Sequence, residues 1–285
     1  MKILVTGGNG QLGCEINQLS SNYNYDWLFT DTDIFDISDL ININVFLDKC
    51  NPDVIINCAA YTAVDNAEVD FEKANTINHK AVELIAQWSK KNNCKLIHIS
   101  TDYVYDGTSL TPVKEDMQVN PVNNYGKTKL FGDIACLKNN PSSIIIRTCW
   151  LYSSFCKNFV TNMINLMKSK SELKVINDQV GSPTYAGDLA KTVLDLITHK
   201  NWIPGIYHFT NLGKVSWFDF ANDIKSIYGF NTSIDSISSK EYSIKTKRPK
   251  YSLLDNSKIK NTFDIIQMNY LDSLNKCIKI LQNES

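Results

Sequence analysis

Short runs rich in β-branched residues alternate with amphipathic segments through the first half of the chain. Several of these runs are apolar almost throughout, which is typical of parallel strands that are covered on both faces. Residues 70–93 and 125–137 carry apolar side chains at spacings of three and four, as amphipathic helices do. The alternation predicts βαβ units and a parallel sheet. The predicted strands span residues 2–6, 27–30, 54–57, 95–100 and 143–148.

The pattern is looser beyond residue 150. Residues 229–262 are polar and irregular, and the sequence assigns no regular element to them. A smaller second lobe is therefore expected in this half. Its predicted elements are helices over 155–170, 186–199, 219–228 and 271–281, and a strand over 173–176.

Composition narrows the class of protein. The 285 residues are 43% hydrophobic and 21% charged, which is ordinary for a globular chain and excludes a disordered or collagen-like one. The formal net charge of −1 gives no reason to expect a nucleic-acid partner or a membrane surface. No apolar stretch approaches the roughly 18–20 residues that span a bilayer, and no signal peptide is expected at the start. The sequence predicts a soluble, cytoplasmic protein.

The eight cysteines are scattered and include no Cys-x-x-Cys pair. This spacing does not suit a metal site, and a chain without a secretion signal rarely builds a disulfide framework. We expect reduced cysteines, mostly buried as small hydrophobic residues, and no bound metal.

A glycine-rich turn follows the first predicted strand and precedes a predicted helix. It contains Gly7, Gly10 and Gly13. The first permits a tight turn, the second lets backbone N–H groups approach a pyrophosphate, and the third lets the helix pack close to the strand. The helix N-terminus adds partial positive charge that suits a phosphate. The turn predicts a bound dinucleotide, with a purely structural loop as the alternative.

Further candidates follow the second and third predicted strands. Asp31 ends the second strand, where a carboxylate accepts a hydrogen bond from an adenosine ribose 2′-OH and repels a 2′-phosphate. This position favours NADH, although an aspartate there is also typical of a turn. Asp36 and Ile37 are placed to flank an adenine. Residues 58–62 end the third strand at the carboxyl edge, where doubly wound sheets bind ligands.

These features predict two domains. Residues 1–150 would form an NAD(P)-binding domain, to which the chain would return within residues 173–210. Residues 151–285 would mainly form the lobe that binds the substrate.

Tyr125 and Lys129 lie four residues apart on a predicted helix, which places both side chains on one face. A cation about 5 Å from a phenol, at an effective dielectric constant near 20, contributes roughly 3 kcal/mol. We therefore expect Lys129 to lower the phenol pKa from about 10 by about two, toward the range of a general acid–base group. Thr101 ends the fourth predicted strand, where its hydroxyl would bond the same substrate oxygen. A tyrosine and a lysine at this spacing often occur by chance. Together with the glycine turn and the strand end, the pair predicts a catalytic site.

At these motifs the sequence resembles a known family. Residues 6–13, 100–107 and 125–129 match the extended short-chain dehydrogenase/reductase pattern. Within that pattern the match narrows to the dTDP-4-dehydrorhamnose reductase family. This agrees with the predicted α/β fold, a Rossmann-type doubly wound parallel sheet with a smaller C-terminal α/β substrate lobe. The stretches that narrow the match are residues 59–65, 100–107, 121–130, 147–152, 177–184, 248–249 and 252–255.

The resemblance implies roles for individual residues. Tyr125 would donate a proton to the C4 oxygen of a sugar while the nicotinamide of NADPH or NADH delivers hydride to C4. Lys129 would hold the nicotinamide ribose and lower the tyrosine pKa. Thr101 would tune the carbonyl and, with Asp102, contact the sugar nucleotide. The Trp150 indole would pack on the sugar, although a lone tryptophan is more often a core residue. Matching cofactor positions are Gly10, Gln11, Leu12, Asp31, Asp36, Ile37, Ala60, Tyr61 and Thr62.

Two departures from the family limit what the resemblance implies. Some members are described as dimers bridged by magnesium through glutamates. Glu15 fits one such position, but residues 184–188 lack the matching glutamate, so a metal-linked dimer is not expected. Members that also epimerise C3 and C5 of the sugar carry a reactive cysteine where this chain has Asp102 and Tyr103, so we expect no epimerisation at these two carbons.

The C-terminal lobe is expected to bind the nucleotide diphosphate. Residues 240–260 hold seven Lys and Arg, including Lys245 and Arg248, against Glu241 and Asp255. Arg248 is the predicted phosphate contact, because its planar guanidinium matches phosphate bidentately. A solvated basic loop is the alternative.

The predicted activity is NAD(P)H-dependent reduction of the C4 ketone of dTDP-4-dehydro-6-deoxy-L-mannose to dTDP-L-rhamnose. Three alternatives remain: a reductase of a UDP-linked or related keto-sugar, a nucleotide-sugar 4-epimerase, and a non-catalytic NADP-binding subunit similar to the β-subunit of methionine adenosyltransferase. The sequence leaves open the choice between dTDP and UDP, between NADH and NADPH, and between a monomer and a homodimer.

Overall fold

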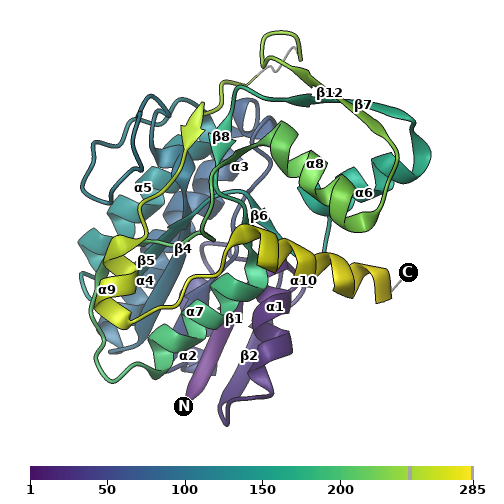
Figure 1. The fold of residues 1–285 in the computed structure, drawn as a ribbon. Coiled ribbons are helices and arrows are strands. Elements are labelled where there is room, and N and C mark those ends of the chain that lie inside the picture. Colours follow the sequence, from purple (N-terminus) through teal and green to yellow (C-terminus); the bar gives the residue numbers. More distant parts are fainter. Residues whose placement is uncertain (243–245, 284–285) are drawn as a thin grey trace.

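A six-stranded parallel sheet forms the centre of the computed structural model, which describes residues 1–242 and 246–283. Every pair of neighbouring strands in it is parallel. The chain winds outward from β1 in both directions (Figure 1). The predicted doubly wound parallel sheet is confirmed. In spatial order the strands are β10 (Gly205–His208), β5 (Ile144–Thr148), β4 (Lys95–Thr101), β3 (Val54–Asn57), β1 (Lys2–Thr6) and β2 (Asp26–Thr30).

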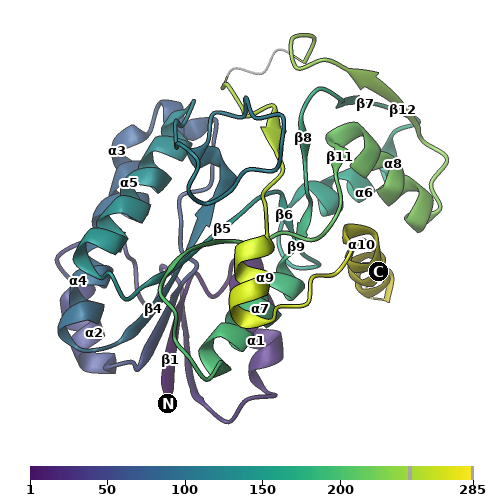
Figure 2. The ribbon, with the colours of Figure 1, turned by 60° about the vertical axis from the view of Figure 1, so that its left-hand side comes forward.

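Helices cover both faces of this sheet. Ile3 and Val5 of β1 pack on one face, and Leu4 between them packs on the other, as the alternation of side chains along a strand requires. Because both faces are covered, these strands are almost entirely apolar. The covering helices are α1 (Gln11–Ser20), α7 (Ala186–Thr198) and α9 (Ser257–Phe263) on one face, and α2 (Ile43–Cys50), α4 (Ala81–Lys91) and α5 (Asn124–Asn139) on the other (Figure 2).

The predicted helix over residues 70–93 is interrupted. It consists of α3 (Phe71–Asn75), a π-helical turn η2 (Thr76–Lys80) and α4. The buried Asn78 side chain of the π turn accepts a hydrogen bond from the N–H of Tyr61 and donates one to its carbonyl. The π turn, a feature that periodicity alone does not predict, therefore fixes the loop that follows β3.

The smaller lobe lies beyond the carboxyl edge of the sheet (Figure 1). Within the described residues 229–242 and 246–262, three elements begin where the sequence assigned none. β12 (Ser233–Ile237) pairs with β7 (Glu172–Ile176), β13 (Tyr251–Ser252) pairs with β8 (Val180–Gly181), and α9 packs against β10. Each of these elements is stabilised by a partner distant in sequence. The lobe contains α6 (Phe159–Ser169), α8 (Trp217–Tyr228), α10 (Tyr270–Asn283), and the strands β6 (Leu151–Tyr152), β7 (Glu172–Ile176), β8 (Val180–Gly181), β9 (Thr184–Tyr185), β11 (Val215–Ser216), β12 (Ser233–Ile237) and β13 (Tyr251–Ser252).

The chain also comes back from the lobe to the central sheet. After β9, helix α7 packs against α1, and β10 pairs with β5 as a sixth strand that the sequence pattern did not predict. Short 3₁₀ turns, η1 (Asn66–Glu68) and η3 (Asp102–Val104), lie in the loops after β3 and β4. Within the two described stretches, no helix is long and apolar enough to cross a membrane.

Candidate active site

A pocket of about 550 Å³ lies at the carboxyl edge of the central sheet. Turns that follow β1 through β5 form its wall together with α1 and α5. Doubly wound sheets bind ligands at this edge, and the volume is that of a small-molecule site. The predicted site residues on the wall are Gly7, Gly10, Gln11, Leu12, Gly13, Asp31, Asp36, Ile37, Ala60, Thr62, Thr101, Asp102, Tyr125, Lys129 and Trp150.

The glycine turn leaves room for a ligand at one position only. Gly7 has a φ of 66°, and a Cβ at Gly13 would lie 2.3 Å from the Gly7 carbonyl oxygen, so neither position tolerates a side chain without rearrangement. A Cβ at Gly10 would meet only that same oxygen, at 3.2 Å, and otherwise open space. Gly10 is the N-cap residue of α1 and has no side chain that could bond the first N–H groups of the helix. These groups are therefore left for an anion. The turn fits a dinucleotide pyrophosphate.

Asp31 lies on the wall at the end of β2. Its carboxylate accepts hydrogen bonds from the N–H of Asn9 at 3.1 Å and from the N–H of Thr32 at 2.8 Å. These bonds stabilise the local turn and hold the carboxylate against the glycine turn. The geometry therefore accommodates both interpretations of Asp31, and a preference for NADH stays a prediction.

Tyr61 is the predicted cofactor residue that the structure places elsewhere. Ala60 and Thr62 line the pocket, whereas Tyr61 lies outside its wall and its hydroxyl donates to Asp70 at 3.1 Å. Both backbone groups of Tyr61 are bonded to Asn78. Tyr61 therefore holds the loop after β3 in place rather than lining the pocket.

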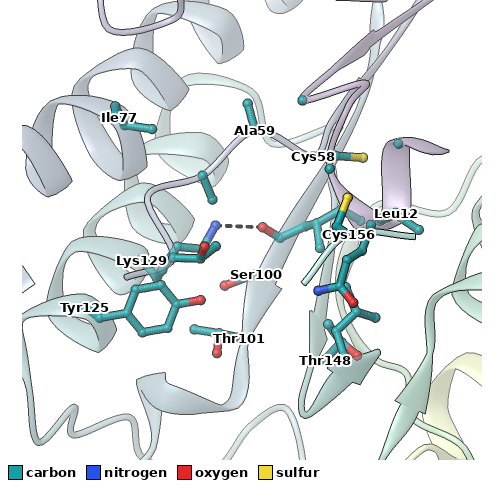
Figure 3. Close-up of a pocket in the computed structure, with 18 of the residues that line it drawn as sticks. Leu12, Cys58, Ala59, Ile77, Ser100, Thr101, Tyr125, Lys129, Thr148 and Cys156 are labelled. Atoms are coloured by element: carbon teal, nitrogen blue, oxygen red, sulfur yellow. Dashed lines mark hydrogen bonds between the residues drawn. The ribbon is translucent and has the colours of Figure 1, made fainter. Parts of the chain in front are cut away.

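The first two turns of α5 carry Tyr125 and Lys129. The side chain of Asn123 caps the helix by accepting from the N–H of Gly126 at 2.8 Å. The Lys129 ammonium donates to the carbonyl of Ile99 in β4 at 2.7 Å. In Figure 3 the Tyr125 phenol, the Lys129 amine and the Thr101 hydroxyl gather around one space. Helix capping and one strand contact thus fix the pair beside the end of β4.

The expected lowering of the Tyr125 pKa is wrong. Burial raises the pKa of Tyr125 to about 12, although a hydrogen bond with Thr101 acts to lower it. Burial also lowers the pKa of Lys129 to about 8, against the opposing charge of Asp133. Loss of solvent around both groups outweighs the attraction that the spacing suggested. At neutral pH the phenol is therefore protonated and is a proton donor.

Trp150 is held in a strained conformation on the pocket wall. Its φ is 49°, a backbone conformation that is costly for a bulky residue. Strained residues of this kind cluster at functional sites. Its ring stacks on Trp217 of α8 at 3.5 Å between centroids. A Cβ at Gly181 would lie 2.8 Å from the indole, so β8 packs directly against it. The lobe therefore fixes the indole, and Trp150 is one of the residues that line the pocket.

Arg248 does not line the pocket. Its guanidinium donates to the carboxylate of Asp65 at 3.0 Å. A contact with a diphosphate stays a prediction. Lys245, the other basic residue named for this segment, lies outside the described residues.

Glu15, which fits a metal position of some family members, is buried. Its carboxylate accepts from the hydroxyl of Ser153 at 2.6 Å and from that of Tyr185 at 3.4 Å. These contacts join α1 to the smaller lobe.

The sequence did not predict several residues that line the pocket or support its wall. Cys156 and Lys157 reach it from the turn after β6, and Trp217 supports Trp150 from α8. No motif marks these positions in the sequence. Ser100 lies beside Thr101 in a recognised motif, and its place on the wall could have been inferred from that.

The model of the RmlD substrate binding domain family matches residues 1–283. The chain belongs to this family. A curated relative, the spore coat polysaccharide biosynthesis protein SpsK of Bacillus subtilis, is 39% identical over 258 residues, which cover 90% of each chain.

Two solved structures of RmlD-type reductases are similar to this chain along almost its whole length. The dTDP-4-dehydrorhamnose reductase of Clostridium acetobutylicum superposes with a TM-score of 0.95 at 41% identity, covering 99% of this chain and 100% of that one. The dTDP-4-dehydrorhamnose reductase of Bacillus anthracis in complex with NADP gives 0.91 at 34% identity, covering 98% and 99%. The family resemblance seen in the sequence is confirmed.

Proposed function

We propose that this protein is an oxidoreductase that reduces the C4 ketone of dTDP-4-dehydro-6-deoxy-L-mannose to dTDP-L-rhamnose with NADPH or NADH. One observation carries the proposal: Thr101, Tyr125 and Lys129 line the same pocket as the glycine turn. The names of the two similar reductase structures support the choice of substrate, because the match covers nearly all of this chain.

The turn after β1 would hold the dinucleotide. The N-terminus of α1 would face the pyrophosphate, with Gly10 leaving space for it, and Asp31 would contact the adenosine ribose. Asp36 and Ile37 would flank the adenine, and Lys129 would contact the nicotinamide ribose. When bound, the cofactor supplies the hydride. The NADP in the Bacillus anthracis relative supports this use of the site.

Tyr125 would supply the proton to the C4 oxygen. Its phenol is protonated at neutral pH because burial raises its pKa. Lys129 is mostly protonated below pH 8, so its ammonium would stabilise the tyrosinate left behind. The hydride and the proton together convert the ketone to an alcohol.

The smaller lobe would hold the sugar nucleotide. Trp150 would pack against the sugar ring, Thr101 and Asp102 would contact it, and Arg248 would bind the diphosphate. We propose the corresponding domain division, with residues 1–150 and part of 173–210 binding the dinucleotide and the rest of 151–285 binding the substrate.

The test is a substrate panel with the purified full chain. Oxidation of NADPH or NADH in the presence of dTDP-4-dehydro-6-deoxy-L-mannose, with dTDP-L-rhamnose as product, is the expected result. A faster reaction with the UDP-linked sugar would change the substrate. Thermal stabilisation by NADP without turnover of any keto-sugar would indicate a binding subunit, and NAD retained through purification would indicate an epimerase.

A homodimer and a cytoplasmic location are part of the proposal. Light scattering during size-exclusion chromatography tests the first, and fractionation of the source cells tests the second. Neither is needed for the chemistry above.

A further inference from the structure

The turn between β6 and α6, residues 153–158, lies directly on the glycine turn. The Cys156 thiol donates to the carbonyl of Asn9 in the glycine turn at 3.2 Å. The Ser153 hydroxyl donates to the carboxylate of Glu15, in the second turn of α1, at 2.6 Å. These two contacts hold a turn of the smaller lobe beside the N-terminal end of α1.

Hydrogen bonds within the turn fix its backbone. The side-chain amide of Asn158 donates to the carbonyls of Ser153 at 2.7 Å and of Cys156 at 3.3 Å. The same side chain caps α6 by accepting from the N–H of Thr161 at 3.2 Å. The residues on both sides of Lys157 are therefore held in place, which fixes where its side chain begins.

Lys157 brings a positive charge to the wall of the pocket. It is exposed and lines the pocket, and no carboxylate in the described parts of the chain forms an ion pair with it. Lys129 is the other cation among the described wall residues, and its ammonium donates to the Ile99 carbonyl. Figure 3 shows Cys156, the neighbour of Lys157, across the space from Lys129. The two cations thus reach the pocket from different sides.

The charge of a dinucleotide needs such a cation. A pyrophosphate brings two negative charges, whereas the N-terminus of a helix is equivalent to only about half a positive charge. The wall already carries the carboxylates of Asp31 and Asp36, which repel phosphate. A lysine next to the glycine turn offsets this repulsion. Since Lys157 stays in water until the ligand arrives, its charge costs no burial in the unliganded protein.

We propose that Lys157 binds the pyrophosphate of the dinucleotide from the smaller lobe. The identity of the dinucleotide rests on the proposed function. The lysine ammonium has three donors on a flexible stem, so it can bond phosphate oxygens that the N–H groups of α1 leave unpaired. One residue of the lobe assigned to the substrate would then belong to the cofactor site.

The test is cofactor binding to the full chain without keto-sugar. Lys157→Gln removes the charge and keeps a polar side chain. We expect the dissociation constants for NADPH and NADH, measured by fluorescence titration, to rise by the same factor of roughly 5 to 30, as for one lost charge-assisted bond. Lys157→Arg keeps the charge and should stay within about threefold of wild type. Lys170→Gln, which removes a lysine charge at the exposed C-terminal end of α6, is the matched control and should bind as wild type.

Salt separates the charge of Lys157 from its shape. The screening length falls from about 10 Å at 0.1 M salt to about 3 Å at 1 M. The difference in NADH affinity between wild type and Lys157→Gln should therefore shrink at 1 M NaCl. A difference that salt does not change would show that the lysine only shapes the turn, and would overturn the proposal.

The two cofactors and the substrate distinguish other positions for the lysine. A loss for NADPH alone would place Lys157 at the 2′-phosphate. A raised KM for the keto-sugar with unchanged cofactor affinity would place it at the diphosphate of the substrate. Either result, or unchanged binding of all three, would overturn the proposal while leaving the reductase function in place. A wild-type protein that binds neither NADPH nor NADH would overturn the proposed function itself.

Discussion

The two sides of the pocket are built in different ways. On the side of the central sheet, four glycines within seven residues shape the turn through their own backbone, and α1 follows directly. On the side of the smaller lobe, the key side chains are held by distant partners: Trp150 by Trp217, and Asp102 by Ser252, 150 residues away. The proposed cofactor side therefore depends on local backbone geometry, whereas the proposed sugar side depends on tertiary pairing.

The largest effect is expected at Tyr125, where the two sides meet. Tyr125→Phe should lower kcat by about 10²- to 10⁴-fold, the usual contribution of a general acid, because no proton is then available to the C4 oxygen. Cofactor affinity should stay nearly unchanged, as measured by fluorescence titration with NADPH. Tyr228→Phe, on the remote helix α8, is the control. An equal loss of cofactor binding and turnover would contradict the assigned role.

Substitution of Trp150 should disturb the sugar side alone. Loss of the indole removes packing worth about 1.5–3 kcal/mol, so Trp150→Ala should raise KM for the keto-sugar roughly 10- to 100-fold. The dissociation constant for NADPH should not change. Trp202→Ala, in which an indole bonded to the Ser142 carbonyl is removed, is the matched control. An unchanged KM would show that Trp150 packs only within the protein.

Substitution of Gly13 should disturb the cofactor side alone. A Cβ there cannot coexist with the Gly7 carbonyl in its present place, so Gly13→Ala must shift the turn at a cost of about 1–3 kcal/mol. The dissociation constant for NADPH should rise roughly 5- to 100-fold.

The control for Gly13 separates stability from binding. Gly229 has a φ of 88° and no atom within 4 Å of an added Cβ, so Gly229→Ala strains only the remote end of α8. It should lower the melting temperature without changing cofactor affinity. If both variants lose stability alike and neither loses NADPH, the glycine turn is only structural.

The smallest effect is expected at Asp31. Asp31→Asn removes the negative charge that would repel a 2′-phosphate. The ratio of kcat/KM for NADPH to that for NADH should rise a few-fold. The exposed neighbour substitution Asp33→Asn should leave this ratio unchanged. An unchanged ratio in Asp31→Asn would leave Asp31 as a turn residue.

The same contrast explains what the sequence could predict. The first five strands lie within one or two residues of their predicted bounds, because apolar runs and glycine turns are local signals. The strands β12, β13 and β10 were not predicted, because each depends on a partner elsewhere in the chain. β12 pairs with β7, β13 with β8 and β10 with β5. The π turn around Asn78 was missed because it leaves the apolar spacing of the helix almost intact.

The candidate site follows the same rule. Motifs placed Thr101, Tyr125 and Lys129 correctly on one wall, since a strand end and the next helix meet over the carboxyl edge. The motifs did not predict that Tyr61 and Arg248 lie outside the pocket wall. The Tyr61 hydroxyl bonds Asp70, and Arg248 pairs with Asp65. The direction of the pKa shift of Tyr125 was predicted wrongly, because the spacing of residues in the sequence does not show how deeply a side chain is buried.

The most direct test of the central claim is a crystal structure of the protein with NADP and dTDP-L-rhamnose. The account predicts that the Tyr125 hydroxyl lies within hydrogen-bond distance of the C4 oxygen, about 2.6–3.2 Å, with the sugar against Trp150. A sugar bound away from Tyr125, or a phenol turned from the nicotinamide, would contradict it.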